Sequence, residues 1–418
     1  MNPRTGLLDR MLDGMPMKMQ DKVTQTMEHM ALVAEMHDPK IATSMAPSVY
    51  RGLWQKRHKK EPHVAMHSGH AVHFDLDYGS DFPEMYDLYR RAVANQWDGE
   101  WQLDWDTDVD PMDSSKPLLG TTPFVPHDML RAAGIKLNTD ERQKLEHHVA
   151  SWMLSQFMHG EQGALYASAQ VTESVQWIDG KLYGATQVMD EARHLEVFLR
   201  YLETKLQRVY KVNDNLFVII DDLLTDSRWD IKFLGMQIMV EGLALGAFST
   251  MYNQTHEPLL KNLLRYVIQD EARHVHYGVL ALREEITTRL TPNERRERED
   301  WAFEIAMLMR NRFLMHEVYE EWFEGILPRR KWNAILLASP AMTKFRSIMF
   351  QRLVPNLKYI GLLSDRMQTY YDKAGLMVYA DGKNASELTE EDLVRDNDAA
   401  ANALQQTREQ RMAERQAA

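Results

Sequence analysis

The sequence has no cysteine among its 418 residues. This absence excludes disulfide bonds, zinc sites with thiolate ligands and cysteine-bound iron–sulfur clusters. Any metal ion must therefore be held mainly by carboxylate and imidazole groups. A chain without disulfides also suits a reducing compartment, and we expect a cytoplasmic protein.

Long apolar runs and excess positive charge are lacking as well. No apolar run of about eighteen residues is evident, and residues 1–19 lack the hydrophobic core of a signal peptide, so we expect no transmembrane segment. The net charge of −12 argues against nucleic acid as the main partner. With 44% hydrophobic residues, the chain is long enough for one large helical domain with appendages or for two modest domains.

What the sequence does contain is a repeated pentapeptide. Asp-Glu-Ala-Arg-His occurs at residues 190–194 and again, letter for letter, at residues 270–274. A lone glutamate, Glu161 or Glu241, stands thirty residues before the glutamate of each copy. The two copies therefore form an internal repeat with a period of eighty residues.

Helix geometry explains why this repeat indicates a metal site. Positions i and i+3 share one helix face, so the Glu and His of each pentapeptide can bind one metal ion together. The lone glutamates lie in apolar segments, where an ionised carboxylate is costly unless a cation neutralises it. Two glutamates and two Glu-x-x-His pairs from four helices match the ligands of a carboxylate-bridged two-metal site. The predicted metal ligands and catalytic residues are Glu161, Glu191, His194, Glu241, Glu271 and His274.

These motifs, over about residues 139–290, resemble the ferritin-like di-iron carboxylate proteins. That superfamily includes ribonucleotide reductase small subunits, soluble methane and toluene monooxygenase hydroxylases, acyl carrier protein desaturases and arylamine N-oxygenases. The resemblance implies an all-α fold, a ferritin-like four-helix bundle with additional N- and C-terminal helices. It also implies two iron ions bridged by Glu191 and Glu271, with Glu161 and Glu241 as terminal or shifting ligands. A surrounding hydrogen-bond network is implied for Asp190, Arg193, Asp270 and Arg273.

Residues that are typical of single subfamilies differ in this chain. Ribonucleotide reductase subunits normally have tyrosine four residues after the first-motif histidine, where this chain has Phe198. Arylamine N-oxygenases add a histidine at the position of Val267, and hydroxylases or desaturases carry threonine at the position of Leu245 or Ala244. The repeated Asp-Glu-Ala-Arg-His motif still resembles the oxygenase branch more than the iron-storage proteins, but these differences leave the subfamily open.

We expect four regions: an N-terminal extension (1–137), the metal-binding bundle (138–290), accessory helices (291–380) and a polar tail (381–418), helical or disordered. Asn138 with Glu141 predicts the start of the first bundle helix, and Thr291 with Glu294 predicts a helix that reaches about residue 323. The pair Asp179-Gly180 predicts the break between the first two bundle helices. The second hairpin is predicted to open near Ser227, and Pro258 to lie in the first turn of the fourth helix.

Two N-terminal features have competing interpretations. Residues 20–36 predict a helix, whereas the cluster His58, His63, His67, His70 and His73 is interpreted as a surface loop rather than a second metal site. Tryptophans recur every fourth residue in 96–111, QWDGEWQLDWDTDVDP. We favour an aromatic anchor that packs this extension onto the bundle; the alternative is a cover for the site or a docking surface.

Three side chains near the predicted ligands have alternative roles. His276 lies about 200° around the helix from His274, so packing is favoured over ligation. Tyr166 and Tyr183 are either redox-active residues or, as we favour, bundle packing.

The favoured function is an O2-dependent di-iron oxygenase or oxidase that hydroxylates, N-oxygenates or otherwise oxidises a small hydrophobic or aromatic molecule. It would need an external electron donor such as a reductase or ferredoxin, and a homodimer matches the broader family. Alternatives are a ferroxidase or iron-handling protein, a Mn/Fe oxidase, a ribonucleotide reductase-like radical subunit, and a helical scaffold with a vestigial site. Manganese accepts the same ligands as iron, so the sequence leaves the metal open.

Overall fold

A computed structural model describes residues 10–35 and 38–388 of the chain. Within these ranges every regular element is a helix, and no strand is present. The expected all-α class is thus confirmed. The buried apolar side chains form one contiguous core that extends from Leu32 to Ala385.

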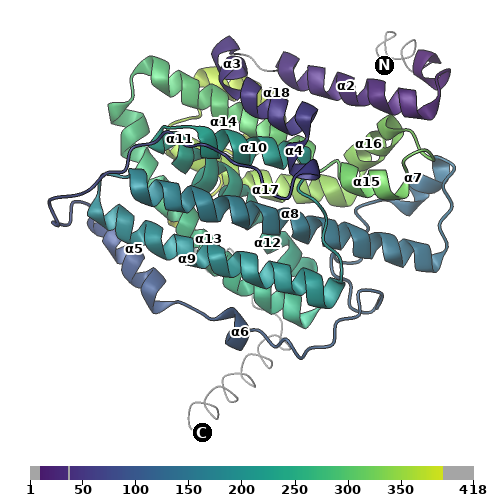
Figure 1. Cartoon of the computed structure of the whole chain (residues 1–418), viewed down its shortest axis with the longest axis horizontal. Helices are drawn as coiled ribbons and strands as arrows, with labels where there is room; N and C mark the ends of the chain where they lie inside the picture. The colour runs from purple at the N-terminus through teal and green to yellow at the C-terminus, as the bar shows by residue number, and fades with distance from the viewer. Residues whose placement is uncertain (1–9, 36–37, 389–418) are drawn as a thin grey trace, which may run out of the picture.

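Four long helical segments carry the repeated motifs, and we call them the motif helices. They are α8 (Thr139–Ser174), α9 (Ile178–Tyr201), the continuous run of α11 (Trp229–Phe233), η3 (Leu234–Val240) and α12 (Glu241–Gln254), and α13 (Pro258–Glu284). The helices α8 and α9 lie side by side across the middle of the molecule, and α12 packs against α13 (Figure 1). The sequential hairpins place all four predicted ligand segments around one shared interior.

Capping explains where several helices begin. Asn138 accepts a hydrogen bond from the backbone N–H of Glu141, whose carboxylate in turn accepts from the backbone N–H of Asn138. Thr291 forms the same capping box with Glu294 before α14 (Pro292–Arg312). Pro258 is the first residue of α13, where its missing N–H costs nothing. These three starts were predicted correctly from the sequence.

Two predicted boundaries were wrong, and a third was right to within two residues. Asp179 and Gly180 lie inside α9, because the chain has already turned at 175–177 and Asp179 instead accepts hydrogen bonds from the Ser80 hydroxyl and a backbone N–H. The second hairpin opens at Trp229, near Ser227 as predicted, but without a side-chain cap, since Asp230 pairs with a buried arginine. The helix after Thr291 ends at Arg312 rather than near residue 323. Met315 there adopts a left-handed φ of 46° before α15 (His316–Trp322).

A seven-residue π-helical segment, η3, directly precedes Glu241. Extended π-helix is rare, and single π turns often occur at functional sites. Shorter π segments close α3, α9 and α13: η1 (Tyr50–Gln55), η2 (Leu202–Leu206) and η4 (Glu285–Arg289). Hydrophobic periodicity did not predict any of them.

The remaining helices cover the motif helices. They are α2 (Met17–Glu35), α3 (Pro39–Val49), α4 (Arg57–Lys60), α5 (Pro83–Ala94), α6 (Gly99–Gln102), α7 (His127–Ala132), α10 (Asp214–Thr225), α16 (Arg329–Ala338), α17 (Pro340–Tyr359), α18 (Asp365–Lys373), η5 (Met377–Tyr379) and η6 (Ala385–Glu387). The predicted N-terminal helix corresponds to α2. The helix α5 packs along the outer face of α9 (Figure 1), and α17 packs against α12. The accessory helices expected in 291–380 include α16 and α17, and Pro355 lies inside α17.

One helical run, Trp229–Gln254, has the length and mean hydropathy of a membrane span, which corrects the expectation that no such run exists. Its most apolar window is 94% buried within the protein. The core therefore accounts for its apolar composition. Glu241 interrupts the run in sequence, which is why simple inspection missed it.

The two ends of the chain are only partly covered. Most of the predicted polar tail, 389–418, lies outside the described residues, as do residues 1–9. The first part of that tail is packed, since the backbone N–H of Ala385 donates to the Asn356 side chain.

Candidate metal centre

All six predicted ligands are buried and meet in the interior of the motif helices. Their exposed fractions range from zero for Glu191 and both histidines to 5% for Glu161. Two overlapping groups have ligand atoms within 4.8 Å of one another: Glu161, Glu191, His194 and Glu271 in the first, and Glu191, Glu241 and His274 in the second. We call them the first and second half-sites; Glu191 belongs to both.

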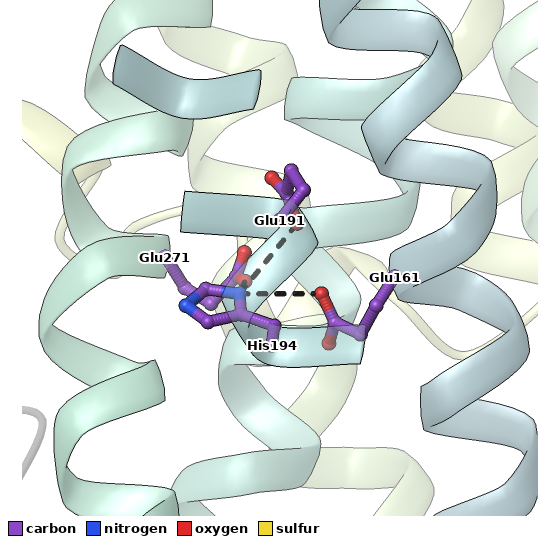
Figure 2. Close-up of side chains that lie close together, drawn as sticks. All are labelled: Glu161, Glu191, His194 and Glu271. Atoms are coloured by element: carbon purple, nitrogen blue, oxygen red, sulfur yellow. Dashed lines mark hydrogen bonds and ion pairs between the residues drawn. The ribbon is translucent and has the colours of Figure 1, made fainter. Parts of the chain in front are cut away.

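His194 lies at the centre of the first half-site (Figure 2). Its Nδ1 is 3.3 Å from a carboxylate oxygen of Glu161, 3.2 Å from Glu271 and 3.6 Å from Glu191. The carboxylates approach this nitrogen from three different helices, α8, α13 and α9. A cation among these four groups would replace the close contacts with metal–ligand bonds.

His274 has the corresponding place in the second half-site. Its Nδ1 is 3.0 Å from Glu191 and 3.6 Å from Glu271. Each of these two glutamates thus lies near the ligand nitrogen of both histidines, as bridging carboxylates require. Glu241 faces the same group and accepts a 2.8 Å hydrogen bond from the Gln187 side-chain amide.

Several buried ligand atoms have no hydrogen-bond partner. They are Oε2 of Glu191, Oε2 of Glu241, both carboxylate oxygens of Glu271 and Nδ1 of His274. Buried polar atoms are normally satisfied, and unsatisfied acceptors that converge on one point are the arrangement a cation completes. The donor set of oxygen and imidazole nitrogen fits first-row divalent metals such as iron and manganese. The residues present therefore fit a metal centre.

The far nitrogen of each histidine is held by the aspartate of the other pentapeptide. Nε2 of His194 is 3.0 Å from Asp270, and Nε2 of His274 is 3.3 Å from Asp190. A carboxylate on Nε2 keeps the proton there and leaves Nδ1 free to bind a metal. This exchange between the copies explains why aspartate precedes the glutamate in both.

Two arginines support the aspartates. Arg193 contacts both Asp190 and Asp270, the second at 3.2 Å, and Arg273 pairs with Asp270. All four residues expected to surround the ligands thus lie there. Because each arginine satisfies a buried carboxylate, it holds the aspartate in position for its histidine.

The N-terminal segment contributes two contacts that sequence analysis did not assign. Trp97 donates from Nε1 to Asp270 at 2.6 Å, and its ring stacks near His194. Gln96 donates to Asp190 at 3.0 Å. The favoured interpretation of the tryptophans as an anchor therefore applies to Trp97, which also lies against the cluster. The regular spacing of the tryptophans marked this segment in the sequence, but nothing there indicated that Trp97 contacts Asp270.

Gln187 is a further unassigned residue in the second half-site. It is fully buried and donates to both Glu191 and Glu241. Its position four residues before Glu191, on the same helix face, is the signal that could have identified it.

Burial and mutual repulsion shape the charges of the cluster in the absence of metal. Burial and the neighbouring Glu271 raise the pKa of Glu161 well above its usual value, and burial with Glu191 does the same for Glu241. Burial alone would lower the pKa of His194 and of His274, but the adjacent carboxylates raise both well above the ordinary value. Without metal the cluster therefore binds protons tightly.

A small apolar cavity of about 20 Å³ adjoins the cluster, with room for about one water molecule. Glu161, Glu241 and Glu271 form one side of it. The lining also contains Phe157 and Phe248, whose ring centroids are 4.7 Å apart. Apart from the glutamates, Gln156 and Arg312, the side chains around this cavity are aromatic or aliphatic.

Other sequence candidates lie elsewhere or are packed. Tyr166 is 50% exposed, which does not suit a buried redox role, whereas Tyr183 is fully buried and its hydroxyl has no partner. His276 belongs to neither half-site within the described residues, as expected.

The interpretation of the histidine-rich stretch as surface is wrong for two of its members. The ring of His58 is only 2% exposed and bonds to Asp214 at 2.9 Å, and His70 bonds to Glu173 at 2.7 Å. Both rings are shielded from solvent because they dock this stretch onto α10 and α8.

Comparisons of the sequence with models of known protein families and with curated proteins found no match. The internal repeat and the geometry of the site thus carry the functional argument.

Proposed function

We propose that the chain is a di-iron oxygenase or oxidase in a ferritin-like bundle. It oxidises a small hydrophobic organic molecule with dioxygen and two electrons from an external donor. The observation that carries this proposal is the convergence of four carboxylates and two Nδ1 atoms in a buried cluster, where several of these atoms have no hydrogen-bond partner among the described residues.

Each group in the cluster has a defined part in this proposal. Glu191 and Glu271 would be shared between two metal ions, since each approaches both histidines, while Glu161 and Glu241 would each complete one half-site. Iron held by these residues would supply the redox chemistry for the reduction of dioxygen. For hydroxylation, one oxygen atom enters a C–H bond and the other leaves as water, with two electrons and two protons from outside. The apolar wall keeps bulk water from the reacting centre.

The test is a screen for products that depend on dioxygen. Protein loaded with ferrous ion is supplied with an electron donor and with small lipids, aromatic compounds and amines, under labelled dioxygen. We expect at least one labelled product, and none with His194→Ala. If no substrate in these classes gives a dioxygen-dependent product while ferrous ion alone is turned over, the oxygenase proposal fails.

A ferroxidase is the second candidate, and one observation favours it. The cavity beside the cluster has room for about one water molecule, which suits dioxygen and water better than an organic substrate. A ferroxidase would consume many ferrous ions per chain without an organic substrate, so the same assay separates the two functions.

A further inference from the structure

One buried arginine beside the proposed metal centre lacks a carboxylate partner in the part of the chain that the structure describes. There, four arginines are less than 9% exposed: Arg193, Arg298, Arg312 and Arg329. Arg193, Arg298 and Arg329 each pair with a carboxylate at 3.2 Å or less. Within the described residues, the guanidinium of Arg312 forms no hydrogen bond or ion pair, although at 3% it is the least exposed of the four.

Arg312 ends α14 and lines the cavity beside the cluster, together with Glu161, Glu241 and Glu271. Its guanidinium carbon lies 4.6 Å from the centroid of the Phe313 ring. Burial lowers the pKa of Arg312 to about 10, so the side chain is still charged at neutral pH. A buried charge without a partner is costly, and natural proteins rarely retain one without a ligand.

Once two metal ions are bound, as the proposed function requires, no carboxylate around the cavity is left to balance the positive charge of Arg312. The four carboxylates of the cluster balance two divalent cations, and Asp190 and Asp270 balance Arg193 and Arg273. The charge of Arg312 is left over. It lines a cavity whose remaining walls are the three cluster glutamates, Gln156 and apolar side chains.

We propose that this cavity binds an organic anion, with the carboxylate of the substrate on Arg312 and its apolar body against Phe157, Val240 and Phe248. A planar guanidinium matches a carboxylate through two parallel hydrogen bonds. An anion held in this way would fix which carbon of the substrate faces the metal ligands. Arg312 is thus a determinant of substrate class and orientation.

The free space of about 20 Å³ is too small for such a molecule unless side chains move. The two phenylalanines are the bulkiest of these lining groups. Binding of an organic acid therefore requires them to rotate, and the affinity of larger acids includes the cost of that rearrangement.

The experiment compares matched acids and amides. Butyrate with butyramide, and benzoate with benzamide, are titrated into the full chain and followed by calorimetry and thermal shift, with and without two equivalents of ferrous ion under anaerobic conditions. We expect the metal-loaded protein to bind each acid at least about tenfold more tightly than its amide. Equal binding of acid and amide would overturn the proposal.

Variants separate recognition from folding. Arg312→Met should abolish the preference for acids while leaving thermal stability unchanged or higher, because an unpaired buried charge is removed. Arg312→Lys should retain part of the preference, and Arg310→Met, two residues earlier on α14, should retain all of it. A preference for acids that persists in Arg312→Met, or a large loss of stability in that variant, contradicts the assignment.

The outcomes also distinguish this inference from the proposed function. Two metal ions per chain with no preference for acids would defeat the inference alone. If acids bind through Arg312 in a chain that takes up no metal, the proposed function fails instead, and Arg312 marks an anion site of another kind.

Discussion

The two half-sites come from identical pentapeptides, yet their surroundings differ. Glu161 belongs to α8, a regular helix of 36 residues, whereas Glu241 directly follows the seven-residue π segment η3. Glu161 faces a histidine, while Glu241 accepts its hydrogen bond from Gln187. Equal sequence spacing thus places equivalent ligands without making the helices that carry them equivalent.

A second difference lies outside the ligands. Asp270, which holds His194, accepts from the indole of Trp97, whereas Asp190, which holds His274, accepts from the amide of Gln96. Two neighbouring residues of the N-terminal segment therefore support opposite half-sites. The half-sites share Glu191, but each should respond separately to changes in the residues that support its own histidine.

The largest expected effect comes from a residue that the half-sites share. Glu191→Ala should reduce bound metal from two ions per chain to nearly none, since Glu191 approaches both histidines. Glu161→Ala, which alters only the first half-site, should retain about one ion. Metal analysis after anaerobic loading measures both, and equal loss from the two variants would remove the distinction between shared and separate ligands.

The pH dependence should be alike in both half-sites. Each contains one glutamate and one histidine with a raised pKa, so metal must displace protons from Glu161 and His194 or from Glu241 and His274. Affinity should rise with pH, by about tenfold per pH unit for each proton displaced. Isothermal titration between pH 6 and 8 measures both steps, and an affinity that falls with rising pH would contradict the account.

The same groups predict the stability of the metal-free protein. Their folded-state pKa values lie above the unfolded ones, so the folded state binds more protons and stability falls as pH rises past the unfolded pKa of each group, about 4.3 for glutamate and 6.5 for histidine. Bound metal should remove this loss. Denaturation at pH 6 and 8, with and without metal, is the check.

A smaller effect should separate the supports. Trp97→Phe keeps the ring but removes the hydrogen bond to Asp270, and should weaken metal binding in the first half-site by about 10- to 100-fold. Gln96→Ala should weaken the second by less, because the hydrogen bond from Gln96 to Asp190 is longer, at 3.0 Å, than the 2.6 Å bond from Trp97 to Asp270. Stepwise metal titration resolves the two, and an equal effect of either variant on both steps would show that the half-sites are coupled.

The smallest predicted effect concerns packing in the two halves. Gly246→Ala would place a Cβ 2.7 Å from the backbone of Met349 on α17, which should cost about 1–3 kcal/mol of unfolding free energy. Gly163→Ala meets only the Ile220 side chain at 3.0 Å, which can rotate, and alanine favours the helix, so the net change should be near zero. Urea denaturation compares the unfolding free energies of the two variants. Equal losses of stability would mean that the backbone of α17 shifts as easily as the Ile220 side chain rotates.

The sequence predicted the ligands better than their supports. Ligand positions follow from i, i+3 geometry and an exact repeat, both of which are local, and capping residues such as Asn138 are local as well. Trp97 and Arg312 reach the site through tertiary packing, which no local sequence pattern encodes. Trp97, for example, is 173 residues away in sequence from Asp270, to which it donates. The π segment was missed because it depends on how α12 packs against its neighbours rather than on periodicity.

The most direct test of the account is an anaerobic titration of metal-free protein with ferrous ion, followed by metal analysis of the wild type and of His194→Ala and His274→Ala. We predict two ions per chain in the wild type and about one in each variant. A wild-type chain that binds a single ion, or none, would contradict the assignment of these six residues to a two-metal centre.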